Sequence, residues 1–159
     1  MRRIRFTEER SGLSVRCELL DAQAPKSAAF LWSLAERGLG FEAMHAMWTG
    51  PEISVPMPAA TLPDDLAALS IPEENATVYP SVGEIVLAYA GAGSIKGLPP
   101  GNFFDIGIFY GDGGRLLMPF GWMRANVCAR IIPEDLAKAQ VDCRTIRRNG
   151  VCQLAIHVD

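Results

Sequence analysis

Two apolar segments, VGEIVLAY at Val82–Tyr89 and FDIGIFY at Phe104–Tyr110, decide the fold of this 159-residue chain. Both are rich in β-branched or aromatic residues, are apolar at nearly every position and are bounded by turn residues. Such continuous apolar runs are typical of strands that are covered on both faces. We therefore predict that the two segments are adjacent strands in the wall of a closed all-β domain.

The second segment runs directly into Gly111–Gly114, whose sequence is GDGG. Its Asp-Gly and Gly-Gly steps supply the positive φ angles that a tight hairpin needs. We predict a hairpin here, with Leu116–Met118 as its returning strand.

The N-terminal half is predicted to contain four strands, with one main helix between the second and the third. Period-two alternation and turn residues predict strands at Arg3–Thr7, Leu13–Leu19, Phe41–Trp48 and Glu52–Val55. Pro25 is expected to begin a helix that ends at Gly38 or Gly40, because proline is tolerated in a first helical turn. A short surface helix with Thr61 as its cap is expected after the fourth strand.

The C-terminal part predicts a strand, a helix and a last strand. From Trp122 onward alternate residues are apolar, and the set expected to face the core is Met123, Ala125, Val127, Ala129 and Ile131. Pro133 is expected to begin a helix that Gly150 terminates. Val151–Val158 is predicted to be an interior strand.

Length and composition indicate one domain spanning residues 1–159, since 49% hydrophobic residues suffice to fill one core. A net charge of −3 gives no basic footprint for nucleic acid or an anionic membrane surface, so neither partner is expected. No apolar run follows the charged start of the chain, and none is long enough to span a membrane. A cytoplasmic location is therefore expected.

The four cysteines, Cys17, Cys128, Cys143 and Cys152, are widely spaced and form no Cys-x-x-Cys pair. No histidine stands at ligand spacing from them, so neither a metal site nor a redox pair is signalled. The loop at 91–102 is rich in glycine, but its glycines do not follow a dinucleotide-binding pattern. We expect no cofactor and no metal, reduced thiols packed in the core, and a loop over the barrel mouth.

About eight strands in this order are best closed as an antiparallel barrel, which removes exposed edges, with two main helices capping the ends. The order resembles the cyclophilin-like barrel. Three segments, Trp48–Ile53 (WTGPEI), Tyr79–Ile85 (YPSVGEI) and Phe109–Gly111 (FYG), resemble a bacterial family of small cyclophilin-like proteins whose activity is not established, domain of unknown function 3830.

For cyclophilins themselves, the resemblance implies prolyl isomerisation by an arginine in the strand after the first helix. The corresponding strand here reads EAMHAM at 42–47 and contains no arginine. The guanidinium that would stabilise the twisting amide is missing at that place, although Arg124 could approach the same face from another strand.

Candidate site residues fall into two groups. His45 and Glu52 flank the turn at Trp48, and a histidine beside a carboxylate suits acid/base work, although a lone histidine in such a strand is more often a packing residue. Aromatic residues with convergent polar groups form the second group: Trp48, Tyr79, Tyr110, Trp122, Arg124 and Asn126. They suit a ligand with an apolar body and an anionic end, unless Arg124 and Asn126 face water.

The sequence thus favours binding of a small molecule or peptide in an aromatic-lined cleft on the barrel. A prolyl isomerase-like enzyme is the alternative. A third interpretation is an assembly component, because the high apolar content allows a barrel face to pair in a homo-oligomer.

Overall fold

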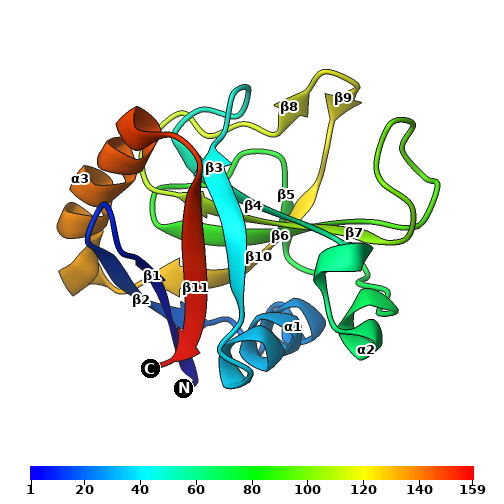
Figure 1. Ribbon diagram of the computed structural model, residues 1–159, viewed down its shortest axis with the longest axis horizontal. Helices are drawn as coiled ribbons and strands as arrows, with labels where there is room; N and C mark the ends of the chain where they lie inside the picture. Colours follow the sequence, from blue (N-terminus) through cyan, green and yellow to red (C-terminus); the bar gives the residue numbers. More distant parts are fainter.

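The computed structural model, which describes residues 1–159, is a closed antiparallel barrel of eight strands. Around the barrel the strands follow the order β2, β1, β11, β3, β4, β7, β6, β10, and pairing of β10 with β2 closes the ring (Figure 1). These strands are β1 (Arg3–Glu8), β2 (Leu13–Leu19), β3 (Gly40–His45), β4 (Glu52–Pro58), β6 (Glu84–Ala90), β7 (Phe103–Phe109), β10 (Ala125–Ile131) and β11 (Cys152–Val158). The prediction of a closed barrel is confirmed.

The two apolar segments Val82–Tyr89 and Phe104–Tyr110 are neighbours in the barrel wall. Strands β6 and β7 pair antiparallel, with Leu87 opposite Ile106 and Ile85 opposite Ile108. Strand β7 pairs on its other side with β4 along seven residues. Both strands are therefore central in the wall, which agrees with their continuous apolar character.

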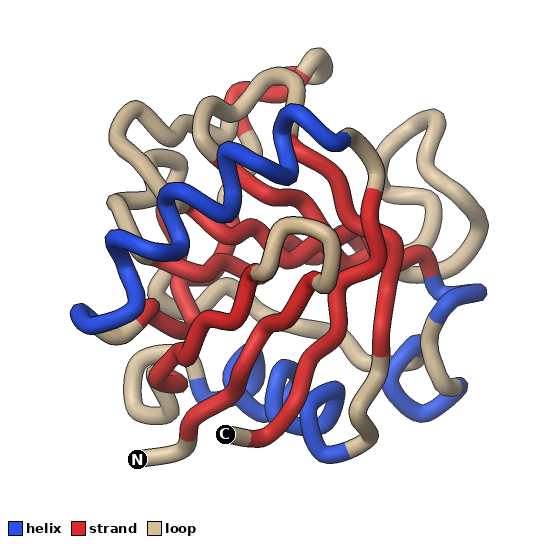
Figure 2. The backbone as a smooth tube through the Cα atoms, turned by 60° about the vertical axis from the view of Figure 1, so that its left-hand side comes forward, coloured by secondary structure: helices blue, strands red, loops and turns tan.

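Two helices close the ends of the barrel (Figure 2). Helix α1 (Pro25–Glu36) and helix α3 (Pro133–Asn149) each begin with the expected proline, whose missing N–H costs nothing in a first turn. Gly150 ends α3 with a φ of +86°, a conformation that glycine adopts without strain. The shorter helices η1 (Ala59–Thr61) and α2 (Asp64–Ala67) follow β4.

The barrel interior is filled by side chains from every wall strand and from both end helices. Fully buried rings include Phe6, Phe30 and Phe104, and the rings of Phe30 and Phe104 stack with centroids 4.7 Å apart. All four cysteines are buried and unpaired. A second, smaller apolar cluster lies outside the interior and consists of Val86, Phe109, Leu116, Ala125 and Val127. This outer cluster shows that the wall around β6 and β7 is covered on its outer face too.

The prediction of a hairpin at Gly111–Gly114 is wrong, because the strand that follows it does not pair with the strand before it. Strand β8 (Leu117–Met118) pairs with β9 (Gly121–Trp122) and not with β7. The segment before β8 is held elsewhere, because the amide of Arg115 donates to the carbonyl of Thr49 at 3.0 Å and the amide of Leu116 to that of Val78 at 2.8 Å. These bonds carry the chain away from β7 and across the outer wall.

Three smaller expectations also need correction. The predicted alternation from Trp122 fails because β10 begins only at Ala125 and its pairing with β6 shifts between Val127 and Ala129, as at a β-bulge. The third strand ends at His45, not at Trp48. Thr61 ends η1 and caps no helix, since α2 begins at Asp64 without a side-chain cap.

The remaining short strand, β5 (Ala76–Thr77), pairs with the start of β10. None of the helices is long and apolar enough to cross a membrane.

Candidate functional site

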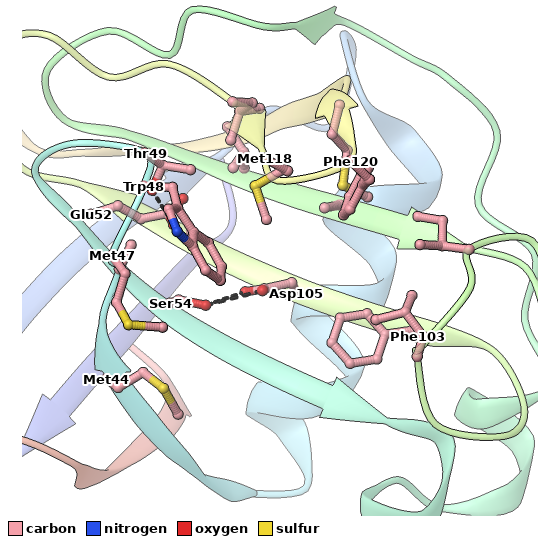
Figure 3. A pocket seen from close by; sticks show the side chains of 18 of the residues that line it. Met44, Met47, Trp48, Thr49, Glu52, Ser54, Phe103, Asp105, Met118 and Phe120 are labelled. Carbon is pink, nitrogen blue, oxygen red and sulfur yellow. Dashed lines mark hydrogen bonds between the residues drawn. The ribbon is translucent and has the colours of Figure 1, made fainter.

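A pocket lies on the outer face of the barrel wall formed by β3, β4, β7 and β6. Because Ile53, Val55 and Met57 of β4 fill the interior, the residues that alternate with them, including Glu52 and Ser54, face outward. The turn at 46–51, the loop at 91–102 and the β8–β9 segment complete this outer-wall pocket, which has a volume of about 150 Å³ (Figure 3). Its lining residues are Met44, His45, Ala46, Met47, Trp48, Thr49, Glu52, Ser54, Val86, Ala88, Ile95, Leu98, Phe103, Asp105, Gly107, Leu116, Met118, Phe120 and Met123.

The pocket is apolar in its walls and acidic in its floor. Thirteen of its nineteen lining residues are hydrophobic, including four methionines and the rings of Trp48, Phe103 and Phe120. Methionine side chains are flexible and polarizable, so they adapt to ligands of irregular shape. The ionisable lining residues are Glu52, Asp105 and His45, and none is a lysine or arginine.

Glu52 is almost fully buried, with 6% of its surface exposed. The Thr49 hydroxyl donates a hydrogen bond to its Oε1 atom at 3.0 Å. Burial, reinforced by the negative charge of Asp105, raises the pKa of Glu52 to about 8. The Thr49 hydrogen bond opposes this rise only in part, so the protonated form of Glu52 is favoured near neutral pH.

Asp105 is half-buried on β7, and the Ser54 hydroxyl lies 2.9 Å and 3.0 Å from its two oxygens (Figure 3). Burial raises the pKa of Asp105 to about 7, against the hydrogen bonds from Ser54 and the Val55 backbone, which lower it. The two carboxyl groups therefore form an interacting pair that resists carrying two negative charges.

Gly107 makes room for the Glu52 carboxyl group. A Cβ atom at this position would lie 2.3 Å from Oε2 of Glu52, 2.9 Å from Cγ2 of Val86 and 3.0 Å from Cε2 of Phe109. Any side chain would displace at least one of these groups. The glycine in the apolar run of β7 thus permits a carboxyl group to lie against the wall.

Three of the residues singled out from the sequence line the pocket: His45, Trp48 and Glu52. Tyr110 lies behind the wall, where it belongs to the interior cluster and contacts His45. Tyr79 and Trp122 are exposed and pack on each other outside the pocket, with ring centroids 5.4 Å apart.

The two polar residues expected to grip an anion lie elsewhere. Arg124 is exposed and forms an ion pair with Glu73 at 3.3 Å. Asn126 is buried, and its amide group donates to Ser27 Oγ at 2.9 Å and to the carbonyl of Pro72 at 2.8 Å. Neither lines the outer-wall pocket, so the expected preference for an anionic ligand has no basis there.

Sequence reasoning missed Asp105, Ser54 and the methionines of the pocket. One signal was available for Asp105, because it is the single charged residue in the otherwise apolar segment Phe104–Tyr110. A lone carboxyl group in a strand covered on both faces indicates a special environment. The methionines gave no such signal, since they come from separate segments. No group of three or more His, Cys, Asp or Glu side chains is gathered closely enough to hold a metal ion.

Comparison with solved structures finds the same fold in McbB, in a structure described as McbB in complex with tryptophan. The TM-score is 0.64 and the sequence identity is 14%, with 97% of this chain and 44% of McbB covered. This chain thus spans less than half the length of that protein. Comparison with curated proteins gives no match.

A family model described as "Protein of unknown function (DUF3830)" matches residues 6–158, which include all eight barrel strands except the first residues of β1. The match confirms the resemblance to domain of unknown function 3830 that the three sequence segments indicate. The chain therefore belongs to the DUF3830 family.

Proposed function

We propose that the protein binds a small molecule in the outer-wall pocket, with the apolar body of the ligand between the thioether and aromatic side chains. The observation that carries this proposal is a concave, mainly apolar lining interrupted by a few polar groups on one floor. Sites for small molecules have this composition. The volume of about 150 Å³ suits a body of roughly one benzene-sized ring.

The structural comparison is compatible with this proposal. McbB is described in complex with tryptophan, which joins an apolar ring system to a small polar part. At 14% identity the likeness extends to the fold alone, so the ligand of this chain is inferred from its own pocket.

Prolyl isomerisation is the alternative that the cyclophilin resemblance suggests. It receives no support from the pocket, because no arginine lines it and Arg124 is paired with Glu73. The alternative predicts faster cis/trans conversion of a proline peptide, reduced by Arg124→Ala. Equal conversion rates with and without the protein would exclude it.

Thermal unfolding with two neutral probes, indole and 2-phenylethanol, tests the binding proposal. At about ten times the dissociation constant, a ligand specific for the native state raises Tm by about 3–6 °C for a chain of this size. The Ala88→Phe variant places a ring in the pocket and should abolish the shift, whereas Val141→Phe, at an exposed position on α3, should retain it. An undiminished shift in Ala88→Phe, or no shift in the wild-type protein, would contradict the proposal.

A further inference from the structure

The two carboxyl groups of the outer-wall pocket come from adjacent strands and lie on either side of one cross-strand residue pair, Ser54 and Gly107. In the β4–β7 register, Ser54 is opposite Gly107, while Glu52 is opposite Phe109 and Asp105 is opposite Pro56. Along the strands, Glu52 therefore lies on one side of the Ser54–Gly107 pair and Asp105 on the other. Both side chains face outward into the pocket (Figure 3).

The pocket gives this pair no positive partner. Neither carboxyl group belongs to an ion pair, whereas acidic side chains elsewhere on the protein form several ion pairs with arginines. Oε1 of Glu52 accepts from Thr49, but no hydrogen bond reaches its Oε2 atom, which lies over the bare Cα of Gly107. Glu52 is thus more than nine-tenths buried and has one oxygen free to accept a donor from the pocket.

We propose that this acidic floor selects ligands that carry a protonated amino group, with the ammonium held between the Glu52 and Asp105 carboxylates and the apolar body between the methionines and rings. The proposal rests on small-molecule binding in this pocket and adds the chemical class of the ligand. An ammonium donates three hydrogen bonds, and charge-assisted bonds to carboxylates are the strong ones. An anionic ligand would instead meet two carboxyl groups and no cation.

No other charged side chain competes for the floor. His45 lines the pocket but is neutral at pH 7, because burial lowers its pKa. Lys96 belongs to the loop at 91–102, whose lining residues are Ile95 and Leu98. Arg115 lies beside the turn at Gly50 and donates to the carbonyl of Gly113. The strand β6 and the β8–β9 segment contribute only apolar lining residues, including Val86, Ala88, Met118 and Phe120.

Binding of such an amine is expected to release protons from the protein. The pair holds protons near neutral pH, whereas a bound ammonium favours the ionised carboxylates. Affinity should therefore rise from about pH 6 to about pH 8.5, and should fall only when the amine itself loses its proton near pH 10.

Isothermal titration with three probes of one shape tests the proposal: phenethylamine, 2-phenylethanol and phenylacetate. At about pH 8 we expect phenethylamine to bind at least about tenfold more tightly than the alcohol, and phenylacetate to bind more weakly than either. Binding of phenethylamine should release a fraction of a proton from the carboxyl pair, measured as a dependence of the binding heat on the ionisation enthalpy of the buffer. The alcohol should show no such dependence.

Two variants assign the effect to the floor. Glu52→Gln and Asp105→Asn should each reduce the preference for amine over alcohol, measured in the same variant as the ratio of the two dissociation constants, by about tenfold. Glu73→Gln removes the same charge at an exposed position outside the pocket and should change nothing.

The outcomes separate the two proposals. Equal affinities for the three probes, or tighter binding of phenylacetate, would overturn amine selection while leaving small-molecule binding intact. The same amine preference in Glu52→Gln and Asp105→Asn as in the wild-type protein would also overturn it. No binding of any probe would contradict both proposals.

Discussion

The Nε2 atom of His45 lies 2.7 Å from the hydroxyl oxygen of Tyr110, and its Nδ1 atom lies 2.8 Å from the carbonyl oxygen of Ala46. Burial lowers the pKa of His45, so its ring is neutral near pH 7 and carries a single N–H. Because the carbonyl of Ala46 can only accept, this N–H is on Nδ1, and Nε2 accepts from the tyrosine. His45 is therefore a neutral, positioned side chain at the edge of the pocket, and burial keeps its pKa low.

Removal of this hydroxyl should destabilise the protein. Tyr110→Phe leaves Nε2 of His45 without its donor, and we expect a loss of about 1–2 kcal/mol in the free energy of unfolding near pH 8. Tyr79→Phe alters an exposed tyrosine and should stay within about 0.5 kcal/mol of the wild-type value. Urea denaturation measures both variants. Similar losses in the two would show that the bond to His45 contributes nothing.

Glu52→Gln should change how stability depends on pH. In the unfolded chain both carboxyl groups titrate near pH 4, but their pKa values in the folded protein are raised. The native state therefore binds their protons more tightly, so their contribution to stability is complete below about pH 4 and is lost as pH rises to about 8.

The variant lacks the Glu52 titration while keeping an oxygen that accepts from Thr49. We expect it to be about 1–2 kcal/mol more stable than the wild-type protein near pH 9 and nearly equal to it near pH 4. Chemical denaturation across this pH range checks the expectation, with Glu73→Gln as control. A difference that does not change with pH would mean that Glu52 does not titrate in this range.

Gly107→Ala should disturb the pocket floor and the wall together. The added methyl group would lie 2.3 Å from Oε2 of Glu52 and 2.9 Å from Cγ2 of Val86, so the carboxyl group must move. We expect a loss of about 1–3 kcal/mol in stability and weaker binding of phenethylamine by the folded variant. Gly12→Ala is the control, because a Cβ atom there would have no other atom within 4 Å. Its positive φ adds backbone strain, so this control is compared for amine affinity and not for stability. Unchanged amine affinity in Gly107→Ala would contradict the role given to the Glu52 carboxylate.

Trp48 should report ligand binding by its fluorescence. It lines the pocket with about half of its surface exposed, whereas Trp122 is exposed outside the pocket. An aromatic ligand that enters the pocket changes the surroundings of Trp48 alone. The probe is phenethylamine, which has no indole ring of its own. We expect the fluorescence change that it causes to disappear in Trp48→Phe and to persist in Trp122→Phe. The reverse pattern would locate the ligand outside the pocket.

Asn126→Ala should affect stability and not binding. The Asn126 side chain joins Ser27 and Pro72, and its Oδ1 atom accepts from the amide of Glu74 at 3.0 Å. Loss of these buried hydrogen bonds is expected to cost about 2–4 kcal/mol in the free energy of unfolding. Probe affinity, measured by titration at a temperature where the variant is folded, should equal that of the wild-type protein. A large loss of affinity would give Asn126 a role in binding that its position does not suggest.

Much of the fold follows from short-range patterns. Neighbouring residues are enough to predict the wall strands β6 and β7, the prolines that begin α1 and α3, and the glycine that ends α3. The prediction failed where distant segments compete for a partner. Gly111–Gly114 has the composition of a hairpin, yet the chain beyond it bonds to Thr49 and Val78.

The candidate site was predicted less well than the fold. His45, Trp48 and Glu52 lie close together in the sequence near one turn, and the pocket includes all three. Arg124 and Asn126 were grouped with them on the assumption of regular alternation along one strand. Arg124 precedes β10, which begins only at Ala125. Ala125 and Val127 belong to the outer cluster, so the side chain of Asn126 lies on the other face, where it bonds to Ser27.

The sequence by itself determined the main wall strands and the starts of the two end helices, because hydrophobic period and turn chemistry act between residues a few positions apart. Only the tertiary structure decided which face of the doubly apolar strand β7 is turned outward. That choice places Asp105 beside Ser54 and brings Glu52 over Gly107. It depends on how distant strands pair and pack around a closed barrel, and no local pattern contains that information.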